Sequence, residues 1–286
     1  WRCVRYAVTQ LPHQQPSRLA VEVLAEHGAV DVLLCEPSLA GGEYAAEVCA
    51  IAATSSACER STLEALVRAN GGWSALSDRG SDASGELVCA VAASLAGRGR
   101  IDLLSWFLEQ AHSLRACERF PDAVDANGTL AEEFSDANPP HPSLAPCLEA
   151  ARHGQTAALE WLRAHCWPWC ALVTRAACEQ GHTDTLKWLV AHGCPMDDSS
   201  ILFAARRGHR DVVAFLLLDP CEECVEYRLN LRADISFVYE EAAEGKQYDL
   251  IRWLRSIGHP CDPLYSPAPE FARRGAFDML RWWYDE

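Results

Sequence analysis

Apolar positions recur at helical spacing through the second half of the chain. In residues 183–191, Leu186, Leu189 and Val190 fall on one side of the segment, around Trp188. This spacing predicts an amphipathic helix. A second apolar segment precedes it and ends at Gly181, so the pattern predicts two helices joined by a tight turn.

The same pattern is repeated along the chain. A glycine is followed after two residues by an aspartate, and after three more by a tryptophan or phenylalanine. The copies are Gly99/Asp102/Trp106, Gly154/Ala157/Trp161, Gly181/Asp184/Trp188, Gly208/Asp211/Phe215, Gly245/Asp249/Trp253 and Gly275/Asp278/Trp282. Alanine replaces the aspartate in the second copy, and the fifth has one inserted residue. Five of the ten tryptophans therefore share one position of a repeat.

Each residue of the repeat has a physical reason. Small pairs such as Ala204-Ala205 let a neighbouring helix approach closely, and the glycine supplies the conformation that ends a helix in a tight turn. The aspartate lies at the start of the next helix, where the helix dipole favours a negative charge. Gly193 and Pro195 then end the second helix.

One such unit cannot bury its own apolar face, so neighbouring units must stack. We predict an all-α solenoid of about eight helix–turn–helix units, forming one domain over residues 1–286. Residues 1–112 hold divergent copies, and residues 143–286 hold clearer ones. The tryptophans of the repeat are expected to be largely buried between second helices.

Residues 204–213, AARRGHRDVV, resemble the helix-turn segment of the ankyrin-repeat family. Successive centres at Trp161, Trp188 and Phe215 are 27 residues apart, whereas the family's unit has about 33. The family's Thr-Pro-Leu-His opening is also absent, so the resemblance implies short or missing β-hairpin fingers. The compact unit is similar to divergent ankyrin repeats that are abundant in giant DNA viruses and some protists. Two other repeat types fit less well: tetratricopeptide units lack the Gly-His turn, and HEAT-like units suit only the wider N-terminal spacing.

Residues 113–142 interrupt the repeats with an acidic, proline-containing insertion. Residues 118–136 carry six acidic residues against Arg119 alone. The insertion is either a solvated surface excursion or an element that docks a basic partner.

Net charge and cysteine usage restrict the class of protein. A net charge of −15 disfavours direct nucleic-acid binding. The 14 cysteines are scattered through a long chain, which indicates a reducing, intracellular setting and not a small disulfide scaffold. No apolar run is long enough to span a membrane. We expect the cytoplasm or nucleus, with a virion or organelle assembly left open.

The sequence shows no constellation for catalysis, and we expect neither enzymatic activity nor a cofactor. Cys221 and Cys224 have the spacing of half a zinc site, but a second pair is missing. The stretch Cys166-Trp-Pro-Trp-Cys170 is interpreted as a loop with packed tryptophans. The repeated histidines, at 165, 182, 192 and 209, are interpreted as structural hydrogen-bonding groups.

The pattern favours a non-enzymatic protein–protein interaction scaffold with protein partners. Two alternatives remain: a permanent structural subunit of a large complex, and the substrate receptor of a ubiquitin ligase whose F-box lies outside this chain. The family resemblance implies that first helices line a concave face, and that the residues before each glycine turn are free to vary. The candidate partner-binding residues there are Arg152, Glu179, Arg206, Arg207, Arg273 and Arg274; the alternative is that they are solvated helix ends.

Overall fold

The computed structural model describes residues 53, 59–69, 72–73, 82–120, 122–124, 141–196, 199–219, 235–259, 261 and 266–285. Within these residues the protein consists of helices and turns, with no β-strand. The all-α prediction is therefore confirmed. Residues 1–52, in which the first of the expected units falls, lie outside the described residues, as do most of the insertion and both Cys221 and Cys224.

The chain divides into two compact units. Unit 1 comprises Trp1–Ala150 and Gln155–Trp169, and unit 2 comprises Ala151–Gly154 and Cys170–Glu286. That the whole chain forms a single domain stays a prediction.

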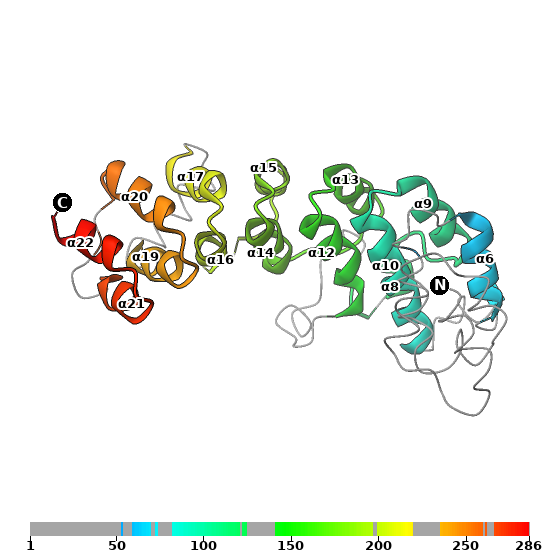
Figure 1. The fold of residues 1–286 in the computed structure, drawn as a ribbon. Coiled ribbons are helices and arrows are strands. Elements are labelled where there is room, and N and C mark those ends of the chain that lie inside the picture. Colours follow the sequence, from blue (N-terminus) through cyan, green and yellow to red (C-terminus); the bar gives the residue numbers. More distant parts are fainter. Residues whose placement is uncertain are drawn as a thin grey trace, which may run out of the picture. The chain divides into compact units, whose positions relative to one another are not determined.

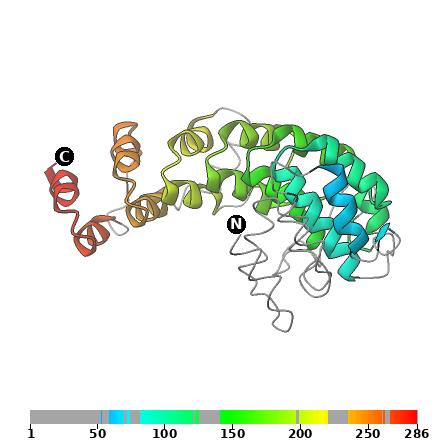
Figure 2. The same cartoon turned by 45° about the vertical axis from the view of Figure 1, so that its right-hand side comes forward.

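Unit 2 is a row of helix pairs joined by tight turns (Figure 1). The pairs are α14 (Ala171–Gln180) with α15 (Thr183–Ala191), α16 (Ser200–Arg207) with α17 (Arg210–Leu218), α19 (Ile235–Glu244) with α20 (Tyr248–Ser256), and α21 (Ala268–Arg273) with α22 (Phe277–Asp285). Each first helix packs against the next one, α14 against α16, α16 against α19, and α19 against α21. The second helices lie along one side of this row of first helices, as Figure 2 also shows.

Unit 1 is built on α8, against which α9, α13 and η1 pack. Its helices are α6 (Arg60–Ala69), α8 (Asp82–Gly97), α9 (Ile101–Gln110), α10 (Ala116–Arg119), η1 (Pro142–Leu144) and α13 (Thr156–Ala164); α12 (Ala145–Arg152) runs from unit 1 into unit 2. Val88, Leu95, Leu104 and Phe107 are fully buried in its core. The second helix that the Gly99/Asp102/Trp106 copy predicts is present as α9.

The tryptophans of the repeat are each partly buried: none is fully enclosed in the core, and none is fully exposed. In α15 the stripe of Leu186, Leu189 and Val190 fills the core instead. Trp188 lies at the rim, where its ring stacks on His192 with centroids 4.2 Å apart.

A cation from the preceding unit covers each such ring in the later part of unit 2. Lys187 lies 5.9 Å from the Phe215 ring centroid, Arg210 lies 4.9 Å from that of Trp253, and Arg252 lies 5.7 Å from that of Trp282. A cation over an aromatic face is attracted by the ring quadrupole. The repeated aromatic position therefore links successive second helices at their rim.

Among the tryptophans that the structure describes, the fully buried one lies in the loop after α13. Trp167 is buried, and its indole Nε1–H donates to the carbonyl oxygen of Leu114 at 3.3 Å. Trp169 is half-buried, with the Arg163 guanidinium 4.1 Å from its ring centroid. The interpretation of this stretch as a loop with packed tryptophans is confirmed.

Among the described residues, no helix combines the length and the apolar character that crossing a membrane would require.

Candidate partner-binding surface

The C-terminal turns of successive first helices are joined by side-chain hydrogen bonds. His182 bonds through Nε2 to the carbonyl oxygen of Arg152 at 2.9 Å, and His209 bonds in the same way to that of Glu179 at 3.0 Å. Gln247 donates to the carbonyl oxygen of Arg206 at 3.4 Å. A helix leaves its last carbonyls without intrahelical partners, so the next unit supplies the donor. This confirms that His182 and His209 are structural hydrogen-bonding groups.

The glycine of each turn has no side chain, so it leaves room for the histidine or glutamine that donates this hydrogen bond. Gly154 has φ +68°, and a Cβ added there would lie 2.8 Å from Nδ1 of His182. Gly181 faces His209 in the same way, and Gly208 faces Gln247. The Gly-His pair of the repeat therefore acts between units: the glycine of one unit accommodates the histidine or glutamine of the next.

The fifth copy of the repeat has one inserted residue, and it keeps a close contact between units in a different way. Lys246 takes the left-handed conformation, with φ +60°, so Gly245 is displaced one position earlier. An added Cβ on Gly245 would lie 2.6 Å from the carbonyl carbon of Arg206 and closer still to its oxygen. Here the glycine permits a close approach between the backbones of α16 and α19.

One register position of these turns alternates in charge along the chain. Two residues before each left-handed turn residue stand Arg152, Glu179, Arg206, Glu244 and Arg273. We call this set, with the adjacent Arg207 and Arg274, the first-helix row. Because the turns from Arg152 to Glu244 are bonded one to the next, the backbone fixes the spacing of the charges that they carry.

The charges of the row are paired between units. Arg206 donates to Glu241 at 2.6 Å and to Glu244 at 2.5 Å, both on α19. Arg207 pairs with Glu179 on α14 at 2.7 Å. Half of each of these two arginine side chains stays exposed.

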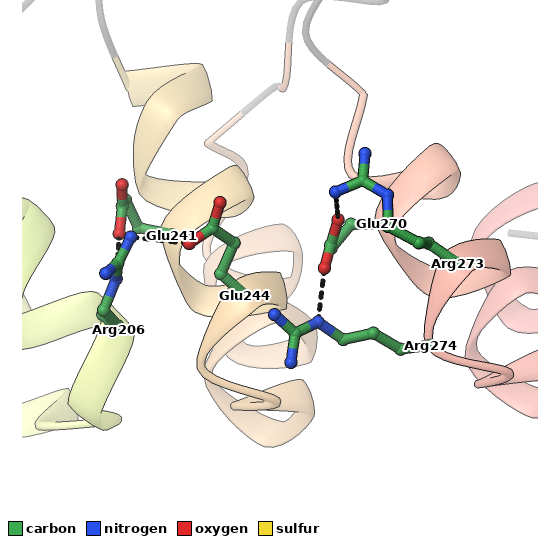
Figure 3. A network of polar contacts seen from close by, with 6 residues as sticks. All are labelled: Arg206, Glu241, Glu244, Glu270, Arg273 and Arg274. Atoms are coloured by element: carbon green, nitrogen blue, oxygen red, sulfur yellow. Dashed lines mark hydrogen bonds and ion pairs between the residues drawn. The ribbon is translucent and has the colours of Figure 1, made fainter.

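In the last unit both arginines pair with a carboxylate of their own first helix, α21. Arg273 lies 2.5 Å from Glu270, and Arg274 bonds to the other oxygen of the same carboxylate. Figure 3 shows this group beside the group formed by Arg206, Glu241 and Glu244. The Arg273 side chain is 73% exposed, whereas that of Glu270 is 8% exposed.

The pairing shifts the titration of these groups. The hydrogen bond from Arg274, followed by the charge of Arg273, lowers the pKa of Glu270, although desolvation acts in the opposite direction. The hydrogen bond to Glu241 raises the pKa of Arg206. Both effects keep the ion pairs charged at neutral pH.

The candidate residues thus lie along one set of turns, but they do not form isolated basic spots. Arg206, Arg207, Arg273 and Arg274 all have acidic partners, and the Arg152 carbonyl accepts the His182 bond. Whether they bind a partner stays a prediction. Glu241 and Glu270 were not among the residues predicted from the sequence. The spacing of Glu270 from Arg273 and Arg274, three and four residues along a helix, could have indicated that pair.

Within the described part of the chain, no cluster of three or more His, Cys, Asp or Glu could hold a metal ion.

The paired charges of the row can recognise charged groups of a protein by exchanging partners, because exposed ion pairs contribute little on their own, about 0–1 kcal/mol.

One part of the chain matches a known protein family. Residues 175–217 match the family described as ankyrin repeats (many copies). The match spans most of α14 and the helices up to α17, which include the Gly181 and Gly208 turns. It supports an ankyrin-repeat protein. No curated protein sequence matches the chain.

Proposed function

We propose that this chain is a non-enzymatic scaffold that binds a protein partner through the first-helix row. Ankyrin repeats indicate a role in protein–protein interaction. The observation that carries the proposal is the alternation of charge at one register position, from Arg152 to Arg273. The helix–turn–helix pattern itself requires small and apolar residues, glycine and a helix-start aspartate, and leaves these charges unspecified.

The row suits a partner with both acidic and basic side chains along its contact face. A guanidinium binds a carboxylate through two parallel hydrogen bonds. Arg206 and Arg207 are half exposed, so a partner carboxylate reaches them without first opening the fold. Electrostatic complementarity of this kind contributes mainly to specificity and association rate.

A charge swap separates partner binding from the stability of the scaffold. Arg207→Glu combined with Glu179→Arg keeps an ion pair between α14 and α16, and keeps the net charge, but reverses the signs that a partner meets. We expect the double variant to melt within a few degrees of wild type, because an exposed pair contributes at most about 1 kcal/mol. Its affinity for the natural partner should fall about tenfold or more.

The partner itself is obtained by chemical cross-linking in the source cells. Arg281→Glu, a reversal of an exposed residue on the second helix α22, serves as the control outside the row and should bind as wild type does. If the swap variant also binds as wild type does, the row is not the partner surface. Stoichiometric recovery in a particle-sized assembly would favour the structural subunit instead, and recovery with a cullin adaptor would favour the ligase receptor.

A further inference from the structure

Two segments of unit 1 that are distant in sequence are held side by side. The residues from Leu114 to Cys117 lie against the turn that follows α13. Besides the Trp167 indole bond to Leu114, the backbone N–H of Ala116 donates to the carbonyl oxygen of His165 at 3.2 Å. The Arg115 guanidinium donates to Sγ of Cys166 at 3.0 Å. Backbone and side-chain bonds together fix the relative position of the two segments.

This arrangement brings two thiols together. Cys117 and Cys166 directly follow the hydrogen-bonded residues Ala116 and His165. Their thiols lie near enough to interact electrostatically, and neither is in a disulfide. Cys117 is half-buried, whereas Cys166 is 8% exposed. Cys166 also holds a left-handed backbone conformation, with φ +60°. For a residue other than glycine this conformation is unfavourable, and it persists where surrounding contacts impose it.

We propose that Cys117 and Cys166 form a redox-sensitive thiol pair, which a low-molecular-weight disulfide such as oxidised glutathione converts into an intramolecular disulfide. Cys117 is the residue that meets the oxidant, since it is the more exposed of the two. Cys166 is the residue that closes the bond, with Arg115 as its positioning residue.

The reaction is two successive thiol–disulfide exchanges. The Cys117 thiolate attacks one sulfur of oxidised glutathione, so that a mixed disulfide forms and one glutathione thiolate leaves. The Cys166 thiolate then attacks Sγ of Cys117, and the second glutathione leaves as a thiolate. Two protein thiols are oxidised and one glutathione disulfide is reduced to two thiols; the two protons of the protein thiols pass to solvent or to the departing thiolates.

The surroundings of the two sulfurs fit these roles. A guanidinium only donates hydrogen bonds, so Sγ of Cys166 is the acceptor, and this bond holds the sulfur in place beside Arg115. Burial, followed by the neighbouring Cys166 thiol, raises the pKa of Cys117. The first exchange should therefore be slow at neutral pH and should accelerate as the pH rises, because the thiolate is the reactive form.

The test uses the full chain, oxidised glutathione as the probe, and peptide mapping by mass spectrometry without reduction. We expect a peptide pair linked through Cys117 and Cys166, formed faster at pH 9 than at pH 7. The linked protein should melt several degrees higher than the reduced protein, since the bond closes a long loop of the unfolded chain. Recovery of Cys117 and Cys166 in unlinked peptides after prolonged treatment would overturn the proposal.

Single variants distinguish the two roles. Cys166→Ser should accumulate one glutathione on Cys117, whereas Cys117→Ser should leave Cys166 unmodified. Arg115→Met should acquire the mixed disulfide at the wild-type rate but close it about tenfold more slowly, the factor expected for loss of one charge-assisted hydrogen bond. Equal closure rates in wild type and Arg115→Met would remove Arg115 from the mechanism.

Cys170→Ser is the matched control, because Cys170 is a half-buried cysteine four residues from Cys166. This variant should form the Cys117–Cys166 link as wild type does. A link from Cys170 to either residue in wild type, or loss of the Cys117–Cys166 link in Cys170→Ser, would contradict the assigned pair. Helix content measured by circular dichroism identifies any variant that fails to fold, and the remaining variants still decide the outcome.

Discussion

Gly245 shows how single residues set the distance between units. The glycine permits contact with the Arg206 backbone, while the neighbouring Lys246 takes the left-handed conformation. In other turns one glycine both adopts the left-handed conformation and allows the close contact. Here Gly245 allows the contact, and Lys246 adopts the conformation.

The two contributions can be measured separately by replacing glycines with alanine. Gly245→Ala should destabilise the protein by about 3 kcal/mol, because the added Cβ forces α16 and α19 apart. Gly258→Ala should cost only about 1 kcal/mol: the site has φ +79° but no atom within 4 Å of an added Cβ. Urea denaturation gives both values. An equal or larger cost at Gly258 would mean that backbone conformation dominates at these turns.

Tryptophans at the repeat position and in the loop differ in depth, and their contributions to stability should differ accordingly. Trp167→Ala should cost about 3–5 kcal/mol, as expected for a fully buried aromatic residue. Trp188→Ala should cost only about 1–2 kcal/mol, because its ring is already partly exposed. Chemical denaturation of both variants tests the order, and a larger cost at Trp188 would contradict the rim position.

At the scale of the helix pair, histidines of the same repeat have two different roles. His209 bonds to the preceding unit through the Glu179 carbonyl. His192 bonds at 2.7 Å to the Trp188 carbonyl of its own helix, and its side chain is exposed. Sequence position alone distinguishes them: the first kind follows the turn glycine, and the second kind ends the second helix.

Replacement of each histidine by alanine measures how much the units stabilise one another. His209→Ala should lower the free energy of unfolding by about 1–2 kcal/mol, since it removes a hydrogen bond and leaves the Gly181 turn uncovered. His192→Ala should change it by about 0.5 kcal/mol or less, as is usual for an exposed position. If the two variants are equally stable, the His209 bond to the preceding unit adds no more stability than the His192 bond within one helix.

Glu270 makes the last helix pair sensitive to acid. Its folded pKa lies below the ordinary value of 4.5, so the unfolded chain takes up the proton first as the pH falls. The stabilisation by Glu270 is therefore complete above about pH 5 and is lost as the pH falls through the folded pKa. Glu270→Gln should be less stable than wild type at pH 7, and the difference should shrink below pH 4.5. A constant difference from pH 7 to pH 3 would contradict the pairing.

The helices were predictable because their signals are local. The glycine, the aspartate after it and the apolar stripe lie within one unit, and they place α9 and the turn at Gly181 directly. The depth of Trp188 was not predictable, because it depends on how neighbouring second helices pack at the rim. The Arg207–Glu179 pair also lies between units, and one unit read alone contains only half of it.

At the scale of the whole molecule, repetition converts single contacts into a surface. One hydrogen bond between units holds two turns together, and its recurrence at His182, His209 and Gln247 aligns successive turns in a row. The candidate site could be located from the sequence only as a set of positions, Arg152 to Arg274. The pairing of its charges became visible only when the turns were placed beside one another.

Hydrogen–deuterium exchange of the full chain, with and without its cross-linked partner, tests most directly that the first-helix row is the binding surface. We predict that the partner slows exchange of backbone amides in the turns around Gly181, Gly208 and Lys246, and leaves the exposed side of α15, α17 and α20 unchanged. Slowed exchange confined to those second helices, or no change at the turns, would show that the first-helix row is not the binding surface.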